Sequence, residues 1–267
     1  MIFSVEWLYF TIALFGYFTL MWALRPTFKN HGLVDLAWSS SLVMIGVFYL
    51  IQGQGTLPKR LLICVPYIIC GSRLMTGWIL RTITYGADPR WDLWVERWQN
   101  RPNKPNLHWK FFLFYQYQWF TSSYIFSYPV YLVANNTNSF SVLEYIGISL
   151  WATALFLENY ADFQLEIFKR ANKNNKQAIC KTGLWRFCRH PNYFFEFCIW
   201  VSYFIMSIPS FRGVVDFFWS AAVPLVAYLF LVHYTGIPIT ERSSLRRRGE
   251  AYKEYQNKIP AFWPKIF

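Results

Sequence analysis

The chain alternates long apolar blocks with short polar and basic segments. The blocks are each close to the length, about 20 residues, that an α-helix needs to cross a hydrocarbon core. They predict an all-α membrane protein, a helical bundle of about seven membrane-spanning helices. The seven expected spans are Val5–Leu24, Leu33–Ile51, Leu61–Leu80, Phe111–Val133, Val142–Ala161, Asn192–Pro209 and Val214–Tyr234. No repeat or Gly/Ser linker divides the chain, so we expect a single domain over residues 1–267.

Composition and charge strengthen this prediction. The chain is 55% hydrophobic and only 15% charged, which is too apolar for an ordinary soluble domain. Its net charge of +12 lies between the apolar blocks, which argues for membrane orientation and against nucleic-acid binding. Of the 26 Lys and Arg residues, 22 fall on one side of a seven-span arrangement. That side is predicted to be cytoplasmic, in a bacterial inner membrane or the endoplasmic reticulum, with the N-terminus outside and the C-terminus inside.

Several classes of site are missing from the sequence. The first ten residues contain Glu6 and no Lys or Arg, so the first block is expected to be a retained helix rather than a cleaved signal. The five cysteines form no CxxC pair and no zinc-ligand spacing, so we expect no metal site and no disulfide framework. No Gly-x-Gly-x-x-Gly or P-loop motif occurs, so a bound nucleotide would not be held by a Rossmann domain.

Carboxylates recur every four residues where the fifth expected span ends. Glu158, Asp162 and Glu166 therefore share one helical face. Ionisable side chains at membrane depth are costly and usually face a partner or a wet cavity. Glu158 and Asp162 are thus predicted to be functional, able to bind a ribose or hold arginines, and Glu166 to be a solvated helix end.

A dense polar stretch from Lys181 to Tyr193 runs directly into the sixth apolar block. Pro191 suits the first turn of a helix, which would place Asn192 and Glu196 one turn apart on the same face. Basic side chains before a helix N-terminus favour an anion, and the candidates here are Lys181, Arg186, Arg189 and His190. The alternative for Arg189 is a structural ion pair with Glu158 or Glu241.

Two further groups complete the candidates. Glu241 follows the last span, and the arginines at 246–248 could hold phosphates or contact lipid headgroups. In the N-terminal half, Asp35 lies near the start of the second span, where it could pair with Arg73 or Arg81 or donate a proton.

Read together, these motifs resemble the DUF1295 membrane proteins, relatives of the C-terminal domain of steroid 5-alpha-reductases. The resemblance covers roughly residues 31–267. The matching pieces, in order, are Val34–Trp38, Gly86–Trp91, Ala161–Leu165, Thr182–Arg186, Arg189–Phe194 with Glu196, and Gly236–Pro238 with Glu241. Membrane methyltransferases of the isoprenylcysteine type share the Arg-His-Pro-x-Tyr motif and a tail similar to Gly249–Tyr255.

The resemblance implies a membrane-embedded reductase that binds NADPH between its later helices. The reductases' cofactor contacts carry over to Asp162, Asn192 and Glu196, while Glu158 stands where the reductases have an asparagine. At the third-helix position where the reductases have a substrate-binding tyrosine, this chain has Trp78. Asp35 is the candidate catalytic residue. The full set of expected cofactor-binding residues is Glu158, Asp162, Gln164, Lys181, Arg186, Arg189, His190, Asn192, Tyr193, Glu196, Glu241 and Tyr252.

Three functions remain open at this point. The first is NADPH-dependent reduction of a C=C bond in a lipid or steroid-like substrate, for which an aromatic-walled cavity would supply dryness and the basic residues would anchor phosphates. The second is methyl transfer from S-adenosylmethionine, which needs less phosphate binding. The third is non-catalytic lipid binding, which would leave the clustered polar residues at three helix ends unexplained.

Overall fold

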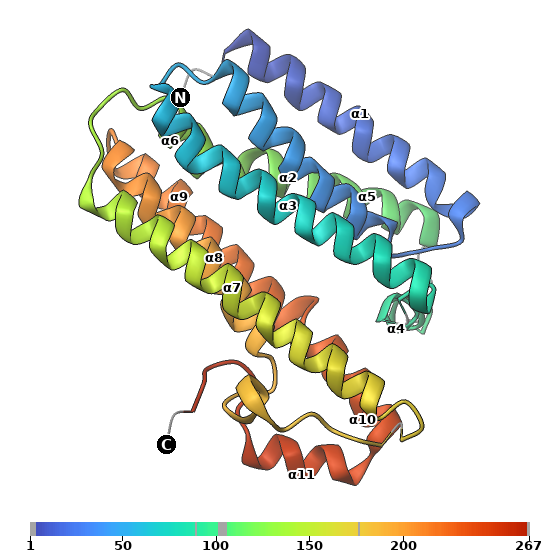
Figure 1. Ribbon diagram of the computed structural model, residues 1–267. Coiled ribbons are helices and arrows are strands. Elements are labelled where there is room, and N and C mark those ends of the chain that lie inside the picture. The colour runs from blue at the N-terminus through green and yellow to red at the C-terminus, as the bar shows by residue number, and fades with distance from the viewer. Residues whose placement is uncertain (1–3, 89, 101–105, 176, 266–267) are drawn as a thin grey trace. The chain divides into compact units, whose positions relative to one another are not determined.

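The computed structural model describes residues 4–88, 90–100, 106–175 and 177–265, and within these ranges the chain is helical, without strands. Pro89, part of one of the family motifs, lies outside the described residues. The helices, drawn in Figure 1, are α1 (Val5–Phe28), α2 (Leu33–Gln52), α3 (Leu57–Tyr85), α4 (Arg90–Gln99), α5 (Leu107–Phe120), η1 (Thr121–Phe126), α6 (Tyr128–Ala134), α7 (Val142–Ala171), η2 (Gly183–Arg186), α8 (Pro191–Ser207), η3 (Ile208–Ser210), α9 (Val214–Tyr228), η4 (Leu229–Tyr234), α10 (Ile237–Arg248) and α11 (Glu250–Lys258).

The helices group into two units, and the boundary passes through α9 after Ser220. The first unit comprises Met1–Ser139 and Ser210–Ser220, and the second comprises Phe140–Pro209 and Ala221–Phe267. The single-domain expectation stays a prediction.

The first unit is built on the antiparallel pair α2 and α3, with α1 and α5 packed beside it (Figure 1). Glycines let the α2 and α3 backbones approach closely. A Cβ at Gly71 would lie 2.8 Å from the Ser39 carbonyl oxygen, and one at Gly46 would lie 2.7 Å from the Ile68 side chain. Small residues at such crossings are typical of membrane helix pairs, where close van der Waals packing replaces the hydrophobic effect.

The second unit is built on the antiparallel pair α7 and α8 (Figure 1). Trp151 Nε1 donates to Tyr203 Oη at 3.1 Å, and a Cβ at Gly147 would lie 3.1 Å from the Ser202 carbonyl oxygen. Nearer the other end, Asn192 Nδ2 donates to Asp162 Oδ1 at 3.0 Å. These contacts share one antiparallel register, and that register fixes which polar residues face each other.

Five helical segments of the described chain are long and apolar enough to cross a membrane, not the seven predicted. They are Val5–Phe28, Leu33–Gln52, Leu57–Tyr85, Pro191–Ser210 and Val214–Arg248. These five agree with the first three and last two expected spans. They are consistent with a membrane protein, although they fix neither its orientation nor its membrane.

The two remaining predicted spans do not form long apolar helices. The expected span Phe111–Val133 is divided into α5, the π-helical η1 and the short α6, with Pro129 in the first turn of α6. The π-helical turn contains the buried hydroxyl residues Thr121, Ser122 and Ser123. Single π-helical turns of this kind interrupt otherwise regular helices. The expected span Val142–Ala161 forms the first part of α7, Val142–Ala171, which is not among the five segments.

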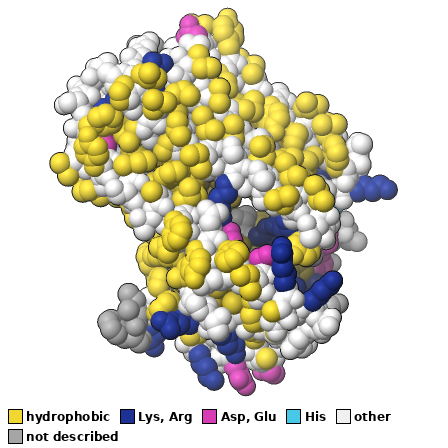
Figure 2. Space-filling view, in the orientation of Figure 1, with side chains coloured by type: hydrophobic (Ala, Val, Ile, Leu, Met, Phe, Trp, Pro, Cys, Tyr) yellow, Lys and Arg dark blue, Asp and Glu magenta, His cyan; other side chains and the backbone are white. Residues whose placement is uncertain are grey.

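Exposed side chains agree with a lipid-facing surface. Figure 2 shows apolar side chains spread widely over one face, with Lys and Arg side chains at the end of the second unit that carries α10 and α11. Many large apolar residues of α1 and α3, including Tyr9, Leu20, Leu80 and Ile83, are more than half exposed. Patches of this extent are unusual on soluble monomers and mark a surface that contacts lipid or protein.

Candidate functional site

The α7–α8 interface carries a column of polar side chains. Asn192 donates through Nδ2 to the Asp162 carboxylate, while its Oδ1 atom is buried without a hydrogen-bond partner in the described part of the chain. The shared register places Glu158, which is 3% exposed, opposite Glu196, one turn deeper than the Asp162–Asn192 pair. The sequence paired Glu158 with Asp162 and Asn192 with Glu196 by helical spacing, and the structure adds the contact between Asp162 and Asn192 that brings the two helices together. Glu166 forms a 2.8 Å ion pair with Arg170, as expected for a solvated helix end.

Gln164 holds the turn at Gly183–Arg186. Its Oε1 accepts a hydrogen bond from the Leu184 backbone N–H at 2.9 Å. Gly183 has a φ of +60°, and a Cβ there would lie 2.2 Å from Gln164 Nε2, so glycine is required twice over. Trp185 Nε1 donates to the Ala161 carbonyl at 3.0 Å. Gln164, predicted as a cofactor contact, is thus a residue that positions the loop.

Arg189 connects three segments of the second unit. Its Nε donates to Glu241 Oε1 at 2.6 Å, its Nη1 donates to the carbonyls of Gln256, at 2.9 Å, and Ile259, and its backbone N–H donates to the Pro260 carbonyl at 2.9 Å. Gln256 Nε2 completes the network by donating to Glu241 Oε2 at 2.7 Å. Of the two sequence-based roles for Arg189, the structure forms the ion pair with Glu241.

His190 belongs to the same network. Its Nε2 lies 3.2 Å from Glu241 Oε1, and its ring stacks on Tyr193 with 5.3 Å between the ring centroids. Burial lowers the pKa of His190 below its ordinary value, and the Glu241 carboxylate offsets only part of that effect. His190 is therefore neutral near pH 7, and with its hydrogen on Nε2 it donates to Glu241.

The remaining candidates are two tyrosines, Tyr193 half-buried and Tyr252 buried, and two exposed cations. Tyr193 Oη lies 3.2 Å from Thr240 Oγ1, and Tyr252 is buried at 5% exposure. Lys181 and Arg186 are exposed, with Lys181 Nζ 5.5 Å above the Tyr255 ring and the Arg186 guanidinium 4.4 Å above the Phe187 ring. These two cations remain accessible to an anionic ligand.

Arg248 has a structural role that the sequence did not reveal. Its Nε donates to the Ala178 carbonyl at 2.9 Å and its Nη1 donates to Ser244 Oγ at 3.2 Å, which ties the loop after α7 to α10. The sequence treated the three arginines at 246–248 alike. Only tertiary contacts separate Arg248, which is half-buried, from the exposed Arg246 and Arg247.

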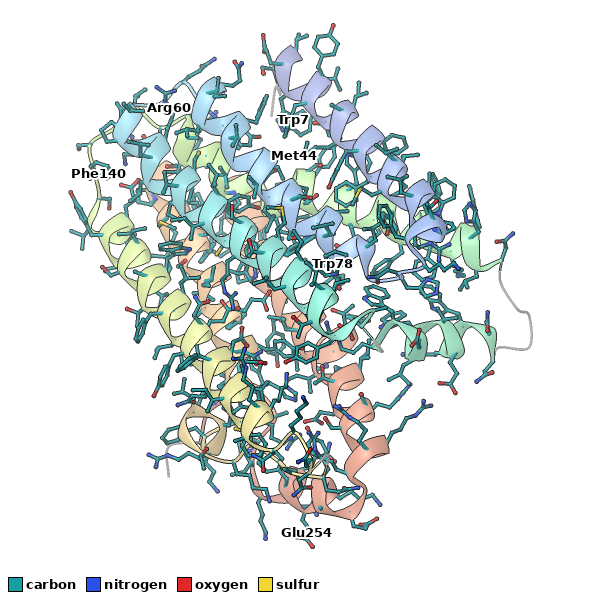
Figure 3. The ribbon with its side chains drawn as sticks, turned by 45° about the vertical axis from the view of Figure 1, so that its right-hand side comes forward. Trp7, Met44, Arg60, Trp78, Phe140 and Glu254 are labelled. Carbon is teal, nitrogen blue, oxygen red and sulfur yellow. The ribbon has the colours of Figure 1, made fainter. Side chains whose placement is uncertain are left out.

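Asp35 lies in the first unit, in a cluster of its own. Its Oδ2 accepts a hydrogen bond from Trp91 Nε1 at 3.2 Å. The suggested ion pair of Asp35 with Arg73 or Arg81 is not formed within the described ranges. Arg81 pairs instead with Asp88, at 2.7 Å, and Asp88 also pairs with Arg90, at 2.6 Å. Burial opposes ionisation of Asp88, but the two guanidinium groups lower its pKa overall. Trp78 is half-buried on α3 (Figure 3), so the place expected for a substrate-binding tyrosine carries an indole.

Two contacts in the second unit were beyond sequence reasoning. Gln256 and the carbonyls of Ile259 and Pro260 come from a tail segment that the sequence shows only as polar residues followed by a Pro-rich end. Tyr255 Oη donates to the Trp185 carbonyl at 2.9 Å and so joins α11 to the Gly183–Arg186 turn. The Arg-His-Pro-x-Tyr motif indicated a site, but it did not indicate that the tail segment 256–260 would contact it.

Comparison with known proteins agrees with the motifs. A family model described as "Protein of unknown function (DUF1295)" matches residues 21–259. An uncharacterised protein of Schizosaccharomyces pombe is 24% identical over 270 residues, which cover 92% of this chain and 76% of that protein. No solved structure matches the chain. Because the family model spans most of its length, the chain belongs to the DUF1295 family.

Proposed function

We propose that this protein is a membrane-embedded, NADPH-dependent reductase of a C=C bond in a lipid or steroid-like substrate. The observation that carries the proposal is Asn192. One end of its amide is fixed by Asp162, and the other end, Oδ1, is a buried acceptor without a partner in the described chain. A buried polar atom left unpaired costs free energy, and such atoms in native structures call for an explanation such as a ligand.

The chemistry of the donor set fits NADPH. Asn192 Oδ1 and the Asp162 carboxylate are acceptors suited to ribose hydroxyl or carboxamide N–H groups. The exposed cations Lys181 and Arg186 suit the phosphates, since charge-assisted hydrogen bonds to phosphate are among the strongest in proteins. When bound, the cofactor would supply a hydride.

The residues of the candidate site position one another for cofactor binding and do not themselves react with the substrate. Asp162 sets the orientation of the Asn192 amide, and Gln164 sets the turn that carries Arg186. Arg189, His190 and Glu241 lock the segment before α8 to the tail, so we assign Arg189 a positioning role rather than a phosphate contact. Asp35 remains the candidate donor of the proton that the second carbon of the double bond requires.

The substrate class follows from the apolar helices. A lipid or steroid-like molecule dissolved in the bilayer could reach a site between such helices without crossing water, and membrane lipids would surround the protein. The split of basic residues supports a cytoplasmic C-terminus, where NADPH is available. A reporter that is active only in the cytoplasm, fused after Phe267, should give signal. Phe267 itself lies outside the described residues.

The experiment that tests the function is a comparison of cofactors on the full-length protein in detergent. A ligand that binds only the folded state raises the unfolding temperature. We expect NADPH to raise it and S-adenosylmethionine to leave it unchanged. Stabilisation by S-adenosylmethionine alone would support methyl transfer instead, and no response to either would favour non-catalytic lipid binding.

A further inference from the structure

Arg25, in the last turn of α1, is a buried cation without a carboxylate partner. It is 6% exposed, and its guanidinium carbon lies 4.0 Å above the centre of the Phe111 ring. Its Nη1 lies 2.9 Å from His31 Nδ1, and its Nη2 lies 3.5 Å from His108 Nδ1. Within the described ranges of the chain, Arg25 forms no ion pair. Two imidazoles satisfy some of its hydrogen bonds but leave its charge uncompensated, whereas buried charges are ordinarily paired.

Two donors in this region have no acceptor. Arg25 Nε and Tyr115 Oη are both buried without a hydrogen-bond partner in the described structure, and Tyr115 is 0% exposed. Tyr115 follows Phe111 by four residues on α5, so the two rings share the helical face that Arg25 covers. Arg25 and Tyr115 are close enough to interact electrostatically. The region therefore combines one guanidinium that forms no ion pair in the described chain with two unused donors, while Asp35 acts electrostatically on Tyr115 and Asp92 on His31.

We propose that Arg25 and Tyr115 bind the carboxylate of an apolar organic acid. A carboxylate would supply one oxygen to each donor and would neutralise the guanidinium. A neutral carbonyl would leave the charge uncompensated, and a phosphate would require more donors than these two. Phe18, Trp91 and Phe111 pack in one hydrophobic cluster with Tyr115, and Phe111 also lies under Arg25, which suits an apolar body behind the acid group. The proposal concerns the first unit alone and does not depend on the proposed reductase function.

Entry to this site requires side chains to move, because both donors are covered. His108 is exposed, and its ring centroid lies 4.3 Å from that of Trp22, whose Nε1 donates to the His108 carbonyl. Since His108 also contacts the Arg25 guanidinium, displacement of this aromatic pair would open Arg25 from the outside.

The test uses the purified full-length protein in detergent, with palmitate as the acid and 1-hexadecanol as its neutral counterpart. We expect palmitate to raise the unfolding temperature and to bind at least tenfold more tightly than hexadecanol. Tyr115→Phe should weaken palmitate binding at least tenfold. Without ligand, Tyr115→Phe should be at least as heat-stable as the parent, because the change removes a buried hydroxyl that makes no hydrogen bond.

Tyr67→Phe is the matched control. Tyr67 is also a 0% exposed tyrosine of the first unit, but its hydroxyl donates to the Phe126 carbonyl at 3.1 Å. It should lose heat stability and keep its palmitate affinity. Arg25→Met, which removes both the charge and the Nε donor, should lose most of the preference for the acid over the alcohol. Equal binding of acid and alcohol by the parent, no binding of palmitate, a less stable Tyr115→Phe, or unchanged affinity in that variant would each overturn the proposal.

Discussion

Arg189 and Arg25 are both buried arginines beside histidines, and their surroundings differ sharply. Arg189 in the second unit meets a carboxylate and two backbone carbonyls, and its own N–H meets a third. Arg25 in the first unit meets two imidazoles and an aromatic ring, and its Nε has no partner in the described chain. The Nε and Nη1 donors of Arg189 are paired with acceptors of the protein, whereas Arg25 keeps one buried donor unpaired in the described chain.

The difference separates structural from ligand-binding roles. A buried polar group contributes modestly when it is paired and costs more when it is left unpaired. Arg189 is paired with parts of the protein that are far apart in sequence, so it stabilises the fold of the second unit. Arg25 forms no ion pair in the described chain and leaves its Nε unpaired. Functional sites commonly retain such a destabilising group because a ligand binds it.

The largest predicted effect is the loss of Arg189. Arg189→Ala should lower the free energy of unfolding by about 3–5 kcal/mol, because it leaves Glu241, whose side chain is only 13% exposed, without its cationic partner. Arg25→Met should cost much less, since no carboxylate is left behind. Denaturation of the full-length variants in detergent measures both losses. Equal losses for the two variants would contradict the contrast between the two arginines.

An exposed ion pair sets the baseline for that measurement. Lys253 Nζ lies 2.6 Å from Glu250 Oε1, and both side chains are more than half exposed. Solvent screens such pairs, so Lys253→Ala should cost less than about 1 kcal/mol. If Lys253→Ala lost as much stability as Arg189→Ala, the burial of an ion pair would not determine its contribution to stability.

The turn held by Gln164 offers a matched pair of glycines. Gly183 and Gly249 both have positive φ, but a Cβ at Gly183 would meet Gln164 at 2.2 Å, whereas a Cβ at Gly249 would meet nothing within 4 Å. Gly249→Ala should cost about 1–3 kcal/mol from backbone strain alone, because its φ of 53° and ψ of −130° lie in a region that other residues rarely adopt. Gly183→Ala should cost more and should recover part of its loss when combined with Gln164→Ala. Equal costs, measured by thermal unfolding, would rule out the proposed close packing.

The smallest effect concerns pH. Because burial lowers the pKa of His190 in the folded state, the unfolded chain takes up the proton first as the pH falls. The contribution of His190 to stability is therefore constant above its ordinary pKa of about 6.5 and is lost as the pH falls from there toward the folded value. Unfolding curves of His190→Gln should show less destabilisation between pH 7 and pH 5 than those of the parent. An identical pH dependence would contradict a buried neutral His190.

The sequence located the apolar helices where composition was uniform. α1, α2, α3, α8 and α9 coincide with long runs of apolar residues, which need no tertiary information to be recognised. The α5–α6 region was predicted as one helix, and hydropathy did not reveal that the π-helical turn η1 divides it. The span predicted within α7 stays unconfirmed, since the helix forms but is not among the five segments both long and apolar enough to cross a membrane.

The candidate site was predictable to the extent that it depends on helical spacing. Glu158 and Asp162 on one helix and Asn192 and Glu196 on the next were grouped by their four-residue intervals, and the structure places them in one register. The partners of Arg189 were not predictable, because the carbonyls of Gln256 and Ile259 lie 67 and 70 residues away along the chain. Backbone acceptors carry no sequence signal, so only the fold reveals which role an arginine takes.

The most direct test of the central claim is the affinity of NADPH for the Asn192→Ala variant, measured beside Asn159→Ala. Asn159 is an exposed asparagine on α7 whose side chain donates to the Leu155 carbonyl, so it controls for loss of an amide from the same helix pair. The account predicts that Asn192→Ala weakens NADPH binding at least tenfold, or about 1.4 kcal/mol, while Asn159→Ala binds like the parent. Unchanged NADPH affinity in folded Asn192→Ala, or equal losses in both variants, would contradict it.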